Sequence, residues 1–293
     1  MTKVAEYLGQ RTDVAEPVIL SAIAGAMCPF MSGACSKVTQ GNKPICSVRG
    51  ADGIIWIACR NRLCATSKGV LSAYQANVLF GVAKVIFGHN IAMADVGIRR
   101  EVSMPLGAGK SYHADFVMVR RDAGGAHGQS RVVLEMQGGG ETSNTGRLTR
   151  RISEWEAAET RTNLMLDHHE AGVGLIVTNA WRRQQEQFLV KGNIATQTGG
   201  GMVFCVGTLL YDHLLAKLHN VHMQDLAQHN WTLALVEFKE DNDVHHSPIS
   251  FSVDRTLFTN YATFVQGLTN QGAPQGNLFS GNFESLDGHR FDV

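Results

Sequence analysis

The segment from Ser111 to Gly140 constrains the fold of this 293-residue chain more than any other. Two runs within it, Tyr112–Val119 and Arg131–Gln137, mix β-branched and apolar residues with polar ones, a pattern typical of strands. The eleven residues between them contain three glycines together with charged residues and serine, so they predict a loop. The segment is therefore expected to form a β-hairpin.

Three polar side chains of this hairpin predict chemistry. Asp115 lies in the first strand, and Glu135 and Gln137 lie in the second, two residues apart and hence on one face of the pleat. Hard cations such as Mg²⁺ bind one or two carboxylates together with the phosphates of a substrate, so Asp115 and Glu135 are candidate Mg²⁺ ligands. The alternative is that these acids simply face water, because acids are common on sheet surfaces.

Charge and hydropathy exclude several classes of protein. The 26 basic and 26 acidic residues cancel, so no field of the whole protein attracts nucleic acid or an anionic membrane, and any basic surface must be local. No stretch reaches the roughly eighteen apolar residues that span a bilayer. The run Pro17–Cys28 imitates an export signal, but Asp13 and Glu16 precede it where such a signal needs positive charge. We therefore expect a buried first helix there.

The cysteines cluster near the N-terminus. Five of the six fall between Cys28 and Cys64, and disulfides are not expected without an export signal. Four thiolates brought together by turns can hold one tetrahedral ion, and sulfur ligands select zinc or iron. With Cys64 left out, the candidate ligands are Cys28, Cys35, Cys46 and Cys59. The alternative is unrelated buried thiols, since free cysteine behaves as a small apolar residue.

Several short motifs together resemble one enzyme family. They are CPF followed after four residues by cysteine, then C-S-V, then C-x-N-R-L, then D-x19-E-x-Q within EMQGGGETSNTG. Over roughly residues 25–190 the chain resembles the NotI family of type II restriction endonucleases. The resemblance implies an α/β fold of the PD-(D/E)XK class, a mixed β-sheet flanked by helices, with a small embedded four-cysteine module that holds iron in this group.

The resemblance also implies an activity. It predicts a Mg²⁺-dependent homodimer that cuts both strands of a short GC-rich palindrome, in a prokaryotic cytoplasm that also holds a cognate DNA methyltransferase. Asp115 and Glu135 would bind Mg²⁺, and Gln137 would orient the attacking water. The chain departs from the pattern of the wider superfamily at His113-Ala114, where a proline is usual, and at Gln137, where lysine is commonest. The NotI group shares the second departure.

One further acid belongs to the predicted catalytic group. The alternating run Ile98–Met104 predicts the strand before the hairpin, and it carries Glu101 fourteen residues upstream of Asp115. In nucleases of this fold an extra acid often contacts the metal through water, so Glu101 is a candidate for that role.

Two polar clusters are candidates for contact with DNA. The first lies at the start of an expected helix, Arg147–His169, where cations oppose the helix dipole and an anionic partner would explain them. The second follows a short apolar run, Gly174–Thr178, and combines side chains that can pair with guanine or adenine with an aromatic ring. The alternative for both is a solvated helix surface. The candidates are Arg147, Arg150, Arg151, Trp181, Arg182, Arg183 and Gln184.

The remaining pattern predicts one structural domain with three parts: a cysteine module in residues 1–68, a nuclease core in residues 69–268 and a polar tail in residues 269–293. We expect a sheet of five or more strands. The expected core elements are helices at Gly69–Gly88, Leu209–Leu218 and Asp254–Leu268, and strands at Gly174–Thr178, Met202–Val206 and Trp231–Phe238.

Two function classes remain open from the sequence. The first is a restriction endonuclease, or a repair-type or non-specific nuclease as a variant of it. The second is a DNA-binding protein that keeps the fold but has lost catalysis, for which the missing lysine would be the sign. The presence of both acids beside EMQGGG favours the enzyme.

Overall fold

The structure is a computed structural model that describes residues 2–16, 19–20, 25–65, 70–106, 111–121, 129–138, 140–168, 173–218, 221–270 and 280–292. Its centre is a six-stranded mixed sheet in the order β12-β11-β10-β7-β6-β5. β7, β10 and β11 run parallel, and the outer neighbours pair antiparallel. The strands are β5 (Val96–Pro105), β6 (Ser111–Arg120), β7 (Arg131–Gln137), β10 (Gly201–Gly207), β11 (Leu233–Glu240) and β12 (Phe251–Thr259).

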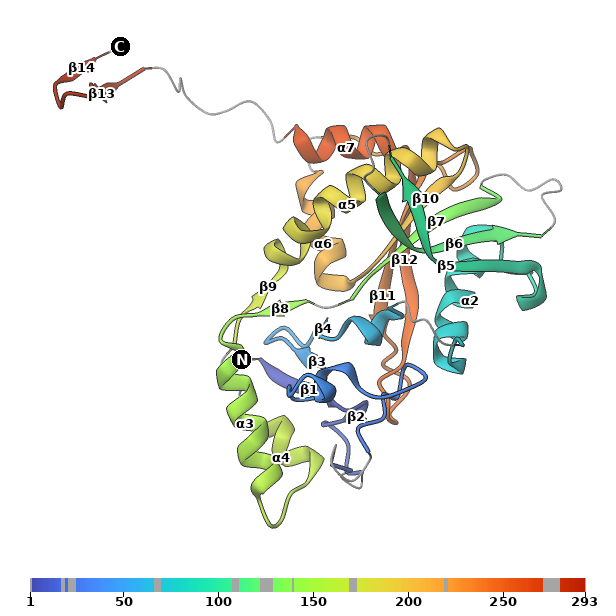
Figure 1. Cartoon of the computed structure of the whole chain (residues 1–293), viewed down its shortest axis with the longest axis vertical. Helices are drawn as coiled ribbons and strands as arrows, with labels where there is room; N and C mark the ends of the chain where they lie inside the picture. Colours follow the sequence, from blue (N-terminus) through green and yellow to red (C-terminus); the bar gives the residue numbers. More distant parts are fainter. Residues whose placement is uncertain are drawn as a thin grey trace.

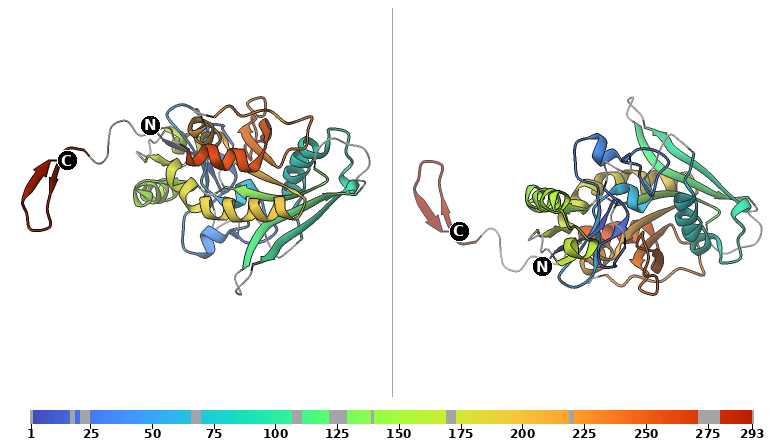
Figure 2. Two further views of the ribbon diagram at one scale, coloured as in Figure 1. Left: turned by 90° about the horizontal axis from the view of Figure 1, so that it is seen from above. Right: turned by 90° about the horizontal axis from the view of Figure 1, so that it is seen from below.

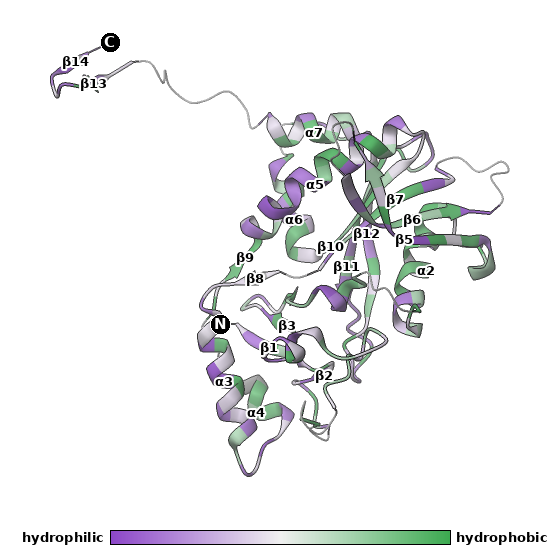
Figure 3. Cartoon of the chain, viewed as in Figure 1, coloured by the Kyte–Doolittle hydropathy of each residue, from purple (hydrophilic) through white to green (hydrophobic). Residues whose placement is uncertain are grey.

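Helices cover both faces of this sheet (Figures 1 and 2). On one face α2 (Ala73–Phe87), largely green in the hydropathy view of Figure 3, packs over a core of sheet residues. On the other face α5 (Val177–Gln197), α6 (Thr208–Lys217) and α7 (Tyr261–Thr269) enclose a second core. The expected α/β class, a mixed sheet flanked by helices, is confirmed.

Residues near the N-terminus form a smaller sheet of their own, in the order β2-β1-β3-β4. A third core joins it to α3 and α4. Short elements in or beside this module are β1 (Lys3–Tyr7), β2 (Gln10–Arg11), α1 (Ser36–Thr39), β3 (Ile45–Arg49), β4 (Ile55–Ile57), the 3₁₀ helix η1 (Arg60–Leu63), β8 (Glu141–Thr142), α3 (Thr145–Ala157), α4 (Asn163–His168) and β9 (Leu175–Ile176). Elsewhere the 3₁₀ helix η2 (Met93–Asp95) precedes β5.

The start of α2 follows from its sequence. Ser72 caps the helix by accepting a hydrogen bond from the Gln75 backbone N–H, and the Gln75 side chain accepts one from the Ser72 backbone N–H in return. This reciprocal capping box satisfies two amide groups that the first turn would otherwise leave unpaired. At the other end Gly88 adopts a positive φ of 110°, which favours glycine.

Three expected elements differ in the structure. Asp254–Leu268, expected as one helix, divides into the end of β12 and α7, because residues 251–259 pair along β11 before Asn260 caps the helix. Gly174–Thr178, expected as a buried central strand, contains only the short β9, which pairs with β8 at the margin, and α5 begins at Val177. The expected helix Arg147–His169 is divided between α3 and α4.

The two ends of the expected domain plan are only partly described. Of Pro17–Cys28, residues 17–18 and 21–24 lie outside the described residues, and the described remainder is not helical. In the tail, β13 (Asn282–Glu284) pairs with β14 (Arg290–Asp292) in a small hairpin that Figure 1 shows extended away from the two sheets. Among the described residues, the helices all fall short of the length and apolar character that a membrane span requires.

Candidate active site

Asp115 on β6 and Glu135 on β7 lie side by side. The register pairs Phe116 with Leu134, so the two acids occupy the next opposed position. There the carboxylates bind the backbone of the neighbouring strand: the Asp115 backbone N–H donates to Glu135 Oε1 at 3.2 Å, and the Met136 backbone N–H donates to Asp115 Oδ2 at 3.0 Å. These reciprocal bonds fix both carboxylates, as the hairpin pattern predicts, while their catalytic role stays a prediction.

Glu101 extends this pair to a third strand. The β5–β6 register places it opposite Asp115, and its backbone has a positive φ of 46°, which residues other than glycine rarely adopt. The alternation of faces along β6 also breaks here, since Ala114 packs in the α5 core but Phe116 packs in the α2 core. Strain held at one row of acids is typical of a functional site.

The three acids line one polar cavity of about 240 Å³. Gln137 joins them from β7, and α5 contributes two amides, Gln184 and Gln187, from one helix face. The complete lining is Arg60, Ala65, Glu101, Asp115, Glu135, Met136, Gln137, Gly138, Gln184, Gln187 and Phe204. The cavity is therefore built from the central sheet, from α5 and from the segment that follows β4.

Burial changes the proton affinity of the two central acids. Desolvation raises the pKa of Asp115, although the Met136 N–H and the Lys191 charge oppose the rise. Desolvation and the charge of Asp115 raise the pKa of Glu135 to about 7, against the lowering effect of Lys191. Two buried carboxylates that repel each other are stabilised by a cation placed between them, so this donor set fits Mg²⁺.

These carboxylates suit a Mg²⁺ ion whose coordination is completed by the phosphate of a substrate. Among the described residues, no group of three or more His, Cys, Asp or Glu side chains is arranged to hold a metal ion. A Mg²⁺ site needs only one or two carboxylates when phosphate oxygens and water complete its coordination. Asp115 and Glu135 would supply that pair.

Lys191 is a candidate site residue that the sequence pattern does not reveal. It lies on α5, is only 1% exposed, and its Nζ donates to Glu135 Oε2 at 2.6 Å. Its ammonium therefore supplies the positive charge that Gln137 lacks. The available signal was a lysine on the buried face of an amphipathic helix, at helical spacing between Phe188 and Ala195.

The predicted DNA contacts are placed unevenly. Arg147 and Arg150 are exposed on the first turns of α3, while Arg151 forms an ion pair with Glu154 at 3.1 Å. Arg182 and Arg183 are exposed on α5. None of these arginines lines the cavity.

The two remaining residues of the second cluster have different surroundings. Gln184 lines the candidate cavity, and its contact with DNA stays a prediction. Trp181 is 5% exposed and packs its ring against Phe188 and Phe204 at 5.6 and 6.4 Å between centroids. The expected contact of Trp181 with a base or sugar is therefore wrong for this structure, because its ring is buried in the core.

The four candidate cysteines are buried in the N-terminal module as two pairs. Cys28 and Cys35 flank a turn closed by an isolated bridge between Met27 and Ala34, and the Cys59 backbone N–H donates to the Cys46 carbonyl at 3.0 Å. Burial raises the pKa of the Cys28 and Cys46 thiols, and Cys59 adds to the rise in both. Cys64 belongs instead to the α2 core. The metal itself stays a prediction, since in the described residues no three or more His, Cys, Asp or Glu side chains are arranged to hold a metal ion.

We expect replacement of Cys46 by serine to remove bound zinc or iron and to destabilise the N-terminal module, because the binding energy of a structural metal is folding energy. The same change at Cys64 should leave the metal content unchanged. Elemental analysis and thermal unfolding of both variants, purified without chelator, measure this. Wild-type protein containing neither metal would contradict the prediction.

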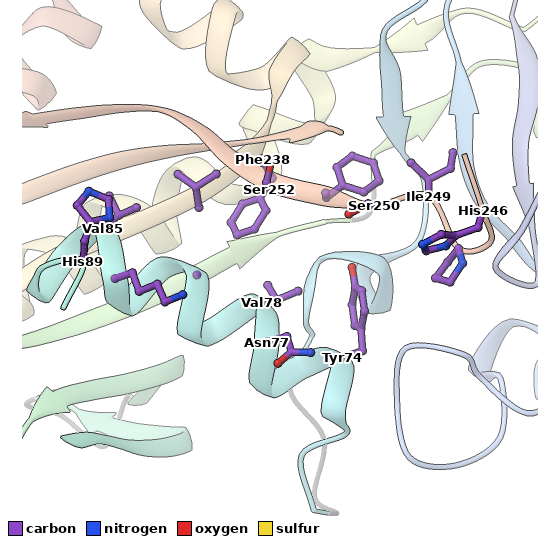
Figure 4. A pocket seen from close by; sticks show the side chains of 15 residues that line it. Tyr74, Asn77, Val78, Val85, His89, Phe238, His246, Ile249, Ser250 and Ser252 are labelled. Atoms are coloured by element: carbon purple, nitrogen blue, oxygen red, sulfur yellow. The ribbon is translucent and has the colours of Figure 1, made fainter. Parts of the chain in front are cut away.

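A second cavity, larger than the first, lies elsewhere and lacks this chemistry. It has a volume of about 480 Å³ between α2 and the β11–β12 hairpin, and Figure 4 shows Tyr74, Phe238 and Ile249 around it. The described residues that line it include no Asp or Glu. It therefore cannot supply carboxylates to a catalytic cation.

Comparison with protein families and with curated proteins gave no match to this chain.

Proposed function

We propose that the chain is a Mg²⁺-dependent, site-specific endodeoxyribonuclease that cuts both strands of a short, GC-rich palindrome as a homodimer. The observation that carries the proposal is the row of Glu101, Asp115 and Glu135 across three strands, completed by Lys191 and Gln137. Paired carboxylates with an adjacent cation in a polar cavity suit hydrolysis of a phosphodiester. In a prokaryotic host a cognate methyltransferase would protect the chromosome.

Each residue has a defined task in this proposal. Asp115 and Glu135 would hold Mg²⁺, which when bound lowers the pKa of water and offsets charge on the phosphate. Lys191 favours the ionised form of Glu135 and holds its carboxylate in place through their 2.6 Å contact. Gln137 orients the attacking water by accepting a hydrogen bond from it. Glu101 accepts a hydrogen bond from a second water beside Asp115.

The duplex would be held outside the cavity. Exposed Arg147 and Arg150 on α3 and Arg182 and Arg183 on α5 are suited to phosphate oxygens, which position a duplex without reading its sequence. Two active sites are needed for two strands, so a twofold dimer matches a palindrome.

Incubation of purified protein with a long GC-rich duplex tests the proposal. Discrete fragments in Mg²⁺ but not in EDTA are expected. A smear would mean a non-specific nuclease, and a gel shift without cutting would mean a DNA-binding protein that has lost catalysis. Light scattering of the complex should give two chains per duplex.

We expect activity at limiting Mg²⁺ to rise with pH around pH 7, because Glu135 must lose its proton to bind the cation and burial raises its pKa to about 7. Replacing Lys191 by methionine removes a charge that lowers this pKa, so the midpoint should move to higher pH and the maximal rate should fall. Cleavage rates between pH 5.5 and 9 at fixed low Mg²⁺ measure both effects. High Mg²⁺ should move the midpoints of both pH–rate profiles to lower pH, since the cation and the proton compete for Glu135. A Lys191→Met variant with the same midpoint as wild type would contradict the role assigned to Lys191.

A further inference from the structure

The segment that follows β4 is pressed against the end of the catalytic strand. The Gly140 backbone N–H donates to the Ile57 carbonyl at 2.7 Å. A Cβ atom added at Gly138 would lie 3.0 Å from both the Cα and the carbonyl oxygen of Arg60, so glycine permits this close approach. The N-terminal module thereby places Arg60 at the wall of the catalytic cavity.

The backbone around Arg60 is held firmly. Its neighbour Arg62 is fully buried and ion-paired with Glu6 at 2.8 Å, and the Arg62 backbone N–H donates to the Cys59 carbonyl at 2.9 Å. Arg60 is therefore the exposed member of an otherwise buried turn. Its guanidinium starts from a fixed main-chain position.

The charge of Arg60 is available to a ligand. Burial raises the pKa of Asp115 and the nearby charge of Arg60 opposes this rise, yet the structure gives the Arg60 side chain no hydrogen bond or ion pair to any described residue. Arg60 is the only Lys or Arg among the described residues that line the cavity. Lys191 is buried outside this lining and is ion-paired with Glu135. A guanidinium that makes no direct bond to the cavity carboxylates is suited to the phosphate that Mg²⁺ would bring there.

We propose that Arg60 is a catalytic residue that binds a non-bridging oxygen of the scissile phosphate, a role that rests on the proposed nuclease function. A guanidinium offers two parallel N–H groups that match phosphate oxygens. Bound there, it stabilises the charge that grows on those oxygens as water attacks. The site is thus completed across two units, with carboxylates from the central sheet and the phosphate-binding cation from the N-terminal module.

The experiment compares Arg60→Ala and Arg60→Lys with Arg121→Ala, which removes an exposed arginine that does not line the cavity. Arg60→Ala should lower kcat on the GC-rich duplex by about 10²-fold to 10³-fold, the effect of losing one group that stabilises the transition state, with KM nearly unchanged. Arg60→Lys should recover part of the loss. Arg121→Ala should match wild type.

Binding of Mn²⁺ without DNA, followed by electron paramagnetic resonance, separates a phosphate contact from a structural role. Removing a cation near Asp115 should tighten Mn²⁺ binding by roughly threefold while activity falls, because like charges no longer repel. Weaker Mn²⁺ binding, or an Arg60→Ala variant within threefold of the wild-type rate, would overturn the role of Arg60 alone. A wild-type chain that cuts no duplex would overturn the nuclease function and this role with it.

Discussion

Replacing Asp115 by asparagine, or Glu135 by alanine, should reduce cleavage in Mg²⁺ by at least about 10³-fold, equivalent to ~4 kcal/mol of activation free energy. Asp115 and Glu135 are the proposed Mg²⁺ ligands, and with Glu101 they are the only carboxylates among the described residues that line the cavity. Loss of a ligand removes charge stabilisation at the phosphate but leaves the contacts with DNA grooves and backbone intact. DNA affinity in Ca²⁺, measured by gel shift, should therefore stay within a few fold of wild type.

A matched control is Asp254→Asn, which changes an exposed acid paired with Lys239 at 3.2 Å on the far edge of the sheet. Exposed pairs of this kind contribute only ~0–1 kcal/mol, so this variant should cut normally. Cleavage above about one per cent of the wild-type rate in Asp115→Asn would place the active site elsewhere.

Local pattern was sufficient for the centre of the site. The mixture of β-branched, apolar and polar residues predicted the strands that became β6 and β7, and the spacing of Glu135 and Gln137 placed both on one face. Glu101 was also within reach of sequence reasoning, because an alternating run before the hairpin must pair with its first strand. The strand register then aligns the three acids, because Glu101, Asp115 and Glu135 occupy opposed positions on β5, β6 and β7.

Side chains that arrive from distant elements could not be predicted in this way. Lys191 is 56 residues from its partner Glu135 along the chain, and only the packing of α5 on the sheet brings them together. Arg60 reaches the cavity through the approach of η1 to Gly138, which no periodicity encodes.

The incorrect predictions share one physical cause, which is that tertiary contacts override the local pattern. Gly174–Thr178 is too short for its period to distinguish a strand from a helix start. The first half of Asp254–Leu268 has helical spacing but forms β12, because a partner strand was available along β11. Trp181 stood among polar residues in sequence, yet the helix turns its ring inward.

The largest effect on stability is expected at Arg62. Its side chain is fully buried, donates to Glu6 Oε2 at 2.8 Å, and is stacked between the rings of Phe30 and Phe251 at 4.5 and 4.4 Å. It also hydrogen-bonds Tyr74 and the Ile249 carbonyl. This cluster joins the N-terminal sheet to α2 and to the segment before β12. Arg62→Met should therefore lower the free energy of unfolding by ~3–5 kcal/mol, because it leaves the Glu6 charge buried without its partner.

Urea denaturation of the two single variants and the double variant apportions this cost. Glu6→Gln alone leaves the Arg62 charge buried without a partner. Glu6→Gln combined with Arg62→Met removes both charges, so it should lower the free energy of unfolding by less than the sum of the two single changes. The amide can still accept from the Ile249 backbone N–H, which now donates to Glu6 Oε1 at 2.9 Å. Arg151→Ala, which breaks an exposed pair, should change stability by less than ~1 kcal/mol. An Arg62→Met variant within 1 kcal/mol of wild type, or strictly additive costs, would show that the pair does not hold the module that carries Arg60 against the catalytic sheet.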